Sequence, residues 1–67
     1  MAEFNEIGRV KVSEATDVVV SKVVEDGELI GVNINKYVTT DKYTGFAKGV
    51  FVPTERIDDF KQLIARI

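Results

Sequence analysis

The chain has 67 residues, which is enough for one small domain over residues 1–67 and no more. It contains neither cysteine nor histidine, so disulfides, thiolate or imidazole metal sites and every catalytic arrangement built on these side chains are excluded. No apolar run approaches the roughly 18 to 20 residues of a membrane-spanning helix, and the acidic residues 1–6 lack the apolar core of a secretory signal. We therefore expect a single intracellular, non-catalytic domain without metal, cofactor or membrane anchor.

Size and charge bear on the partners that this chain can have. A domain this small buries only about 60 % of the surface that its unfolded chain exposes, and self-association is a common way to enlarge such a core. The net charge of −2 provides no overall attraction to nucleic acid. Residues 29–52 are locally basic, because Asp41 is their only acid beside three lysines. An ordinary mixed surface explains this local charge equally well.

Two strands are predicted in the first part of the chain. Residues 4–13 alternate loosely between apolar and polar side chains, and Gly8 lies at a position that suits a β-bulge. Residues 17–25 contain five valines, whose branched side chains favour a strand over a helix. The Asp26-Gly27 pair that follows predicts a tight hairpin turn, because both residues accept a left-handed backbone conformation.

Residues 28–40 show the clearest alternation in the chain and are predicted as the third strand. Its apolar face holds Ile30, Val32, Ile34 and Val38, and its polar face holds Asn33, Asn35 and Tyr37.

A fourth strand is predicted over residues 46–52, after a polar loop. Phe46, Val50 and Val52 have one parity in this segment, and Phe51 has the other. Because Lys48 shares the parity of Val50, we expect a bulge near Gly49 that turns the ammonium group to solvent.

A helix is predicted from Thr54 to the end of the chain. The preceding Pro53 disfavours helical backbone in the residue before it, and Thr54 is expected to cap the first turn. The adjacent Asp58 and Asp59 point in different directions on a helix, so they fit its dipole better than acid/base catalysis. An apolar stripe at helical spacing is expected to pack on the chain's own sheet, on the helix of a partner subunit, or on both. It consists of Ile57, Phe60, Leu63, Ile64 and Ile67.

The predicted order of four strands and one helix leaves one sheet face open, and an open face with aromatic rings, amides and nearby lysines suits single-stranded nucleic acid. Bases stack on aromatic rings at about 1 to 3 kcal/mol each, and lysines follow the phosphates without preference among bases. The candidate contacts are Lys48, Tyr37, Asn35, Lys36, Lys42, Phe51 and Lys22. The alternative is that Tyr37 and Phe51 are buried against a partner subunit.

Three segments together resemble the C-terminal domain of positive cofactor four, a family of transcriptional coactivators and single-stranded DNA-binding proteins with bacterial and phage relatives. The segments are Val32-Asn33-Ile34-Asn35-Lys36-Tyr37, Lys48-Gly49-Val50-Phe51-Val52-Pro53-Thr54-Glu55 and Phe60-Lys61-Gln62-Leu63-Ile64. Their order and spacing carry the resemblance, which extends over about residues 17–67. The chain departs from the family at Val38, where a tryptophan is usual, and at its acidic hairpin tip.

The resemblance implies an α+β fold, in which a four-stranded antiparallel curved sheet (a meander) is followed by one C-terminal helix and two chains form a homodimer through their helices. It implies non-catalytic binding of single-stranded DNA in transcription, replication or recombination, in the cytoplasm or nucleoid. RNA is the alternative ligand, and a transcription or replication protein is a further expected partner. By position, Lys48 matches the family's basic residue before glycine and Tyr37 its aromatic strand end, while Asn35 falls where arginine is frequent. The alternative function is a protein-interaction or dimerisation module with the same fold.

Overall fold

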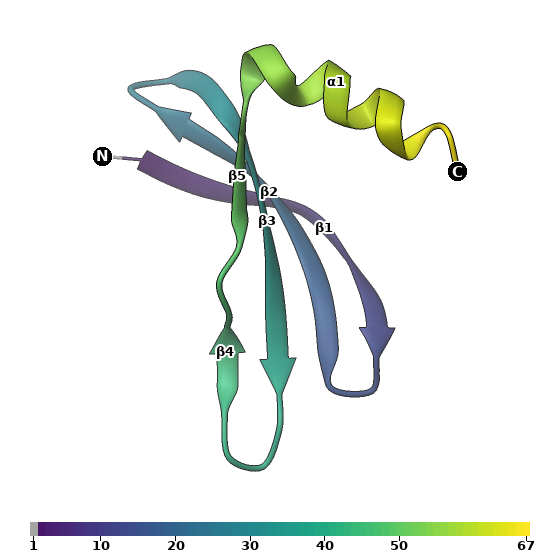
Figure 1. The fold of residues 1–67 in the computed structure, drawn as a ribbon. Helices are drawn as coiled ribbons and strands as arrows, with labels where there is room; N and C mark the ends of the chain where they lie inside the picture. Colours follow the sequence, from purple (N-terminus) through teal and green to yellow (C-terminus); the bar gives the residue numbers. More distant parts are fainter. Residues whose placement is uncertain (1) are drawn as a thin grey trace.

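The computed structural model describes residues 2–67 as one antiparallel sheet followed by a helix (Figure 1). The elements are β1 (Ala2–Ser13), β2 (Thr16–Glu25), β3 (Glu28–Thr39), β4 (Thr44–Phe46), β5 (Val50–Pro53) and α1 (Thr54–Ile64). The strand order is β1-β2-β3-β4, and β5 also pairs with β3. Because β2 occupies one edge of β3, β4 and β5 share the other edge. The predicted α+β arrangement is confirmed, and the long strands curve along their length.

The tight turn between β2 and β3 is formed by the two residues that predicted it. Asp26 and Gly27 have φ angles of 53° and 80°, the left-handed values that match a two-residue turn to the twist of its strands. The bulge expected near Gly8 is also found, since the β1–β2 register shifts between Glu6 and Gly8. Ile7 is therefore the extra residue of the bulge.

A bulge in β3 changes the expected face of one residue. The β2–β3 register passes from Val23–Gly31 directly to Val24–Leu29, so Ile30 has no cross-strand partner. Leu29 lines the cleft under the helix, where the sequence predicted Ile30. The simple alternation of β3 therefore holds only from Gly31 onward.

The predicted fourth strand is two short strands separated by a bulge. Tyr37 pairs with Phe46 and Ile34 with Val50, so three steps along β3 face four steps from β4 to β5. The bulge expected here is confirmed, and one extra residue inverts the alternation. The prediction that Phe46 shares a face with Val50 is therefore wrong, and Phe46 lies on the same face as Phe51.

The helix begins at Thr54 as predicted, but its first turn is not capped by that residue. Pro53 is the N-cap, with the extended backbone angles φ −67° and ψ 156°, and no side chain donates or accepts a capping hydrogen bond. Thr54 lies inside the helix, one position too late for its hydroxyl to act as the N-cap acceptor. The predicted cap is therefore wrong, whereas the boundary set by the proline is correct.

The sheet has two faces, which we name the helix face and the open face. Cross-strand partners share a face, so Val20, Ile34 and Val50 lie together on one side. Val20 and Ile34 line the cleft between α1 and the sheet, which identifies this side as the helix face. The open face carries the side chains of opposite parity, namely Phe4, Glu6, Arg9, Lys11, Asp17, Val19, Ser21, Val23, Asn33, Asn35, Tyr37, Phe46 and Phe51.

The hydrophobic core of the described chain is small. Val19, Val23 and Val52 are its buried apolar residues, with exposed fractions of 1 %, 3 % and 9 %. No residue of α1 is buried, and the helix contacts only β3 and β5. One helix therefore covers only part of one sheet face.

The glycine at the point where β3 meets β5 provides a test of the packing on the open face. A Cβ at Gly31 would lie 2.5 Å from the Phe51 ring and 2.5 Å from the Val52 carbonyl oxygen. We expect Gly31→Ala to lower the free energy of unfolding by about 1 to 3 kcal/mol, because ring and backbone must both move. Gly8→Ala is the matched control, since its Cβ meets nothing within 4 Å. Urea unfolding measures both, and equal losses would contradict the predicted packing.

Candidate nucleic-acid interface

The aromatic side chains of the strands all lie on the open face. Phe4 pairs with Val23, Phe46 with Tyr37, and Phe51 with Asn33. The three phenylalanine rings are 61 %, 55 % and 47 % exposed in chain order, although phenylalanine is usually a core residue. They lie on a sheet whose buried valines, Val19 and Val23, belong to the same face. The open face is thus an aromatic surface on a buried apolar support.

Tyr37, the predicted stacking residue, has its ring engaged by two neighbours. The Phe46 ring centroid lies 5.0 Å from that of Tyr37 at an interplanar angle of 72°, an edge-to-face pair. The Arg9 guanidinium carbon lies 5.2 Å above the Tyr37 ring centroid, within cation–π distance. Tyr37 is therefore half-buried and supports Phe46, whose own ring is the more exposed platform.

The asparagines of β3 form a short hydrogen-bond relay between the aromatic rings. Asn35 Nδ2 donates to the Ala47 carbonyl oxygen at 3.3 Å, and Asn33 Nδ2 donates to Asn35 Oδ1. Gly49 makes this possible, because a Cβ there would overlap the Asn35 amide and lie 2.5 Å from the Ile34 carbonyl oxygen. The bulge between β4 and β5 therefore supplies both the carbonyl that anchors the relay and the space that it occupies.

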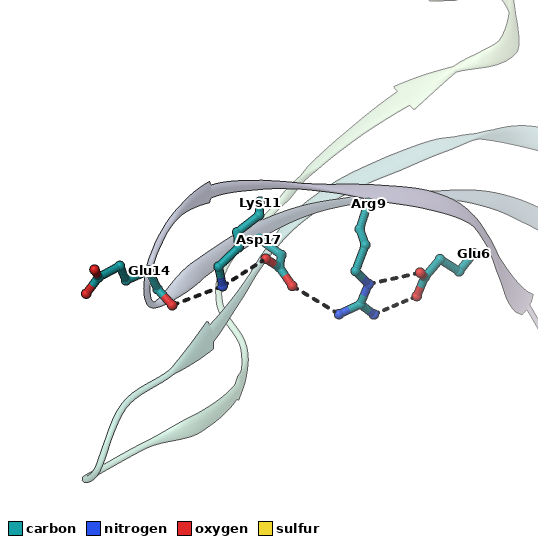
Figure 2. A network of polar contacts seen from close by, with 5 residues as sticks. All are labelled: Glu6, Arg9, Lys11, Glu14 and Asp17. Atoms are coloured by element: carbon teal, nitrogen blue, oxygen red, sulfur yellow. Dashed lines mark hydrogen bonds and ion pairs between the residues drawn. The ribbon is translucent and has the colours of Figure 1, made fainter.

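A network of charged groups runs along the β1 side of the open face (Figure 2). Arg9 donates from Nε and Nη2 to the two carboxylate oxygens of Glu6, at 3.0 and 2.8 Å, and from Nη1 to Asp17 at 3.5 Å. Lys11 Nζ lies 4.0 Å from the Asp17 carboxylate and donates to the Glu14 carbonyl oxygen at 3.0 Å. The positive charges of Arg9 and Lys11 are therefore largely offset by neighbouring carboxylates.

The hydrogen bonds in this network shift the pKa values of its central pair. The two-pronged contact with Arg9 holds the pKa of Glu6 below its usual value, because it stabilises the carboxylate. The same contact raises the pKa of Arg9, with a smaller contribution from Asp17. The pair is thus charged throughout the neutral range.

The predicted lysine contacts are divided between different parts of the molecule. Lys48 is exposed in the bulge between Ala47 and Gly49, the residues that accommodate Asn35. Lys42 is exposed in the connection between β3 and β4. In contrast, Lys22 and Lys36 pair with Val32 and Val18, which places them on the helix face. The structure therefore brings Lys48 close to the asparagine relay and separates Lys22 and Lys36 from the aromatic rings.

Among the residues of this face that carry an aromatic ring, an amide or a guanidinium group, four were not among the candidate contacts. They are Phe4, Arg9, Asn33 and Phe46. Asn33 has the same parity as Asn35, so the alternation of β3 already indicated its position. The positions of Phe4 and Phe46 depend on bulges, which shift an even-numbered residue onto a face with odd-numbered neighbours. Nothing in the sequence alone indicates how many extra residues each bulge contains.

The side chains of the open face can stack on a planar ring, form hydrogen bonds through their amides and form ion pairs. Among residues 2–67, no three acidic side chains come together in a position to hold a metal ion. The one helix that the structure describes, α1, does not have the length and apolar character needed to cross a membrane. In the same part of the chain, no buried side-chain polar atom lacks a hydrogen-bond partner.

Titration of the Glu6 carboxyl group tests the charged network. We expect its midpoint to lie below the ordinary value of 4.5 and to return toward that value in Arg9→Gln. Arg9→Lys should give an intermediate midpoint, because an ammonium keeps the charge but cannot make the two-pronged contact. Since the folded-state pKa is lowered, the stabilisation is present at neutral pH and disappears as pH falls through that midpoint. Carboxyl ¹³C NMR measures it, and identical midpoints in all three proteins would contradict the network.

Comparison of the chain with protein-family models, curated proteins and solved structures finds no significant match. The resemblance to positive cofactor four therefore stays a prediction from the order and spacing of three segments. The arrangement of groups on the open face is the basis for assigning a function.

Proposed function

We propose that this protein is a non-catalytic single-stranded DNA-binding protein that holds one strand on the open face of its sheet. The observation that carries the proposal is the set of exposed rings of Phe4, Phe46 and Phe51 beside the amides of Asn33 and Asn35. Every base has a π-face that can stack on such rings, at about 1 to 3 kcal/mol per base. Binding of this kind fits a role in transcription, replication or recombination.

The phosphates of a bound strand follow the edge formed by β4 and β5. Lys48 is exposed in the bulge of that edge, and Lys42 is exposed in the connection that leads to it. Arg9 and Lys11 lie on the opposite side of the open face, where Glu6 and Asp17 neutralise them. With a net charge of −2, the protein relies more on stacking than on charge, so its affinity is modest.

The charged network is also the observation that favours the alternative function. Carboxylates on a binding face repel phosphates but not a neutral polypeptide, and exposed aromatic rings are common in protein interfaces. A protein-interaction module would use the same rings of Phe46 and Phe51 without Lys48. The two functions therefore differ in whether binding depends on salt and on Lys48.

We further propose that two chains form a homodimer through their helix faces. Leu63 and Ile64 are 58 % and 55 % exposed, and Ile67 is fully exposed at the end of the chain. Between α1 and the sheet lies an apolar cleft of about 380 Å³, with Ile57 and Phe60 on its helix side. A second copy that covers the stripe and the cleft would supply the core that one chain lacks, and it would leave both open faces free.

Binding of a labelled oligothymidine at increasing salt tests the proposed function. We expect binding at micromolar protein in low salt, with log affinity falling linearly with log salt by about 0.7 per phosphate contact. Lys48→Ala should make this slope shallower by about one contact, whereas Lys36→Ala on the helix face is the control and should leave it unchanged.

Substitutions of the aromatic residues should affect affinity and salt slope in a different way in the same titration. Phe46→Ala should cost about 1 to 3 kcal/mol of binding with little change in the salt slope. Tyr37→Ala should weaken binding because it removes the support of Phe46, and Tyr37→Phe, which keeps the ring, should bind like the wild type. If the wild type binds no oligonucleotide in low salt, the protein-interaction module is the better assignment.

Sedimentation tests the homodimer. The wild type should sediment as a dimer at micromolar concentration, and Ile64→Glu should sediment as a monomer, because a carboxylate buried in an apolar interface is unfavourable. Gln62→Glu is the matched control, since it adds the same charge beside the stripe and should remain dimeric. A wild-type protein that sediments as a monomer at this concentration would contradict the proposed dimer.

A further inference from the structure

A hollow on the open face combines aromatic walls with polar side chains. It is lined by Phe4, Ser21, Asn33, Asn35 and Phe46, and its volume is about 280 Å³. Two phenyl rings from opposite sides of the sheet, on β1 and β4, flank polar groups on β2 and β3. Apolar walls with a few oriented polar groups are the usual composition of a small-molecule pocket. A planar ring with a hydrogen-bonding edge fits this composition.

The hydrogen bonds of the two asparagines determine which of their polar atoms remain without a partner in the hollow. Asn35 is anchored on the Ala47 carbonyl oxygen, and its Oδ1 accepts a hydrogen bond from Asn33 Nδ2. Asn33 therefore keeps its Oδ1 as a free acceptor, beside the second N–H of its amide. Because Asn35 orients it, Asn33 presents an acceptor and a donor in a fixed arrangement.

We propose that this hollow is an adenine-preferring pocket and that Asn33 is the residue that determines the preference. The inference rests on the single-strand binding proposed above, and it names the base that the site selects. An amide that offers one acceptor and one donor matches the N6 amino group and adjacent ring nitrogen of adenine, the pairing by which asparagine reads adenine in duplex DNA.

Among the four bases, only adenine has an exocyclic amino group that lies between two acceptor ring nitrogens. Its amino group lies between N7 and N1, so either edge of the ring can meet Asn33. On the edge that carries N7, guanine presents two acceptors, and thymine presents an acceptor and a methyl group on the corresponding edge. The Watson–Crick edges of cytosine, guanine and thymine also place a donor beside an acceptor, so the preference arises from the second edge on which adenine can meet Asn33. The larger purine ring also offers more surface to Phe4 and Phe46. Stacking alone predicts no preference among the bases. The pocket therefore adds a base preference to the open face.

The amino group of adenine can be removed while the purine ring stays intact, and this isolates the contribution of Asn33. The probes are a deoxyadenosine oligomer and an oligomer of equal length built from the deoxynucleoside of unsubstituted purine. We expect the wild type to bind the adenine oligomer about tenfold more tightly. Asn33→Leu keeps the side-chain size but makes no hydrogen bond, so it should bind both oligomers with the affinity that the wild type has for purine.

Two further variants make the comparison decisive. Asn33→Ala is smaller, makes no side-chain hydrogen bond and provides a second test if leucine disturbs the fold, which thermal melting reports. Lys48→Ala is the control, because it should weaken both oligomers equally and leave their ratio at about ten. If the wild type binds both oligomers equally well, the pocket is overturned and the proposed function stands. A preference that persists in both Asn33 variants overturns the role of Asn33, and failure to bind either oligomer overturns the proposed function itself.

Discussion

One extra residue in the chain between β4 and β5 determines what the open face can do. It allows the side chains of Phe46 and Phe51 to lie on the same face, although the two residues are an odd number of positions apart in the sequence. It also brings the Ala47 carbonyl to Asn35 and exposes Lys48 beside it. Without the bulge, continuous alternation would direct Phe46 to the helix face and leave the asparagine relay without its anchor. A local irregularity of the backbone therefore assembles the aromatic, amide and basic groups of the site.

The two faces of the sheet are exposed for different reasons. On the helix face, α1 covers only part of an apolar surface and has no buried residue of its own, so this face lacks packing that a second copy would provide. On the open face, valines beneath the rings are buried, and the rings themselves are exposed on a well-supported surface. The first pattern is typical of an incomplete core and the second of a binding surface.

Charge plays a smaller part in this site than the local excess of lysines suggests. Arg9 is the cation most closely associated with an aromatic ring of the open face, yet Glu6 and Asp17 engage its guanidinium. Its main effect is to hold Tyr37, and through Tyr37 the ring of Phe46, in place. The site is thus organised around aromatic rings and oriented amides, which explains why a protein with a net negative charge can still be proposed to bind a nucleic acid strand.

The sequence by itself determined most of the features that depend on neighbours along the chain, with the helix cap as the exception. The Asp26-Gly27 turn, the valine-rich strand, the shared face of Asn33, Asn35 and Tyr37, and a helix after Pro53 all follow from local backbone preferences and alternation. Only the tertiary structure decided the features that depend on register. The bulges at Ile7 and Ile30 and between β4 and β5 move residues from one face to the other, because a shift of one position inverts the alternation. The placement of Phe4 and Phe46, the contact of Arg9 with Tyr37, and the separation of Lys22 and Lys36 from the rings therefore required the pairing of strands distant in sequence.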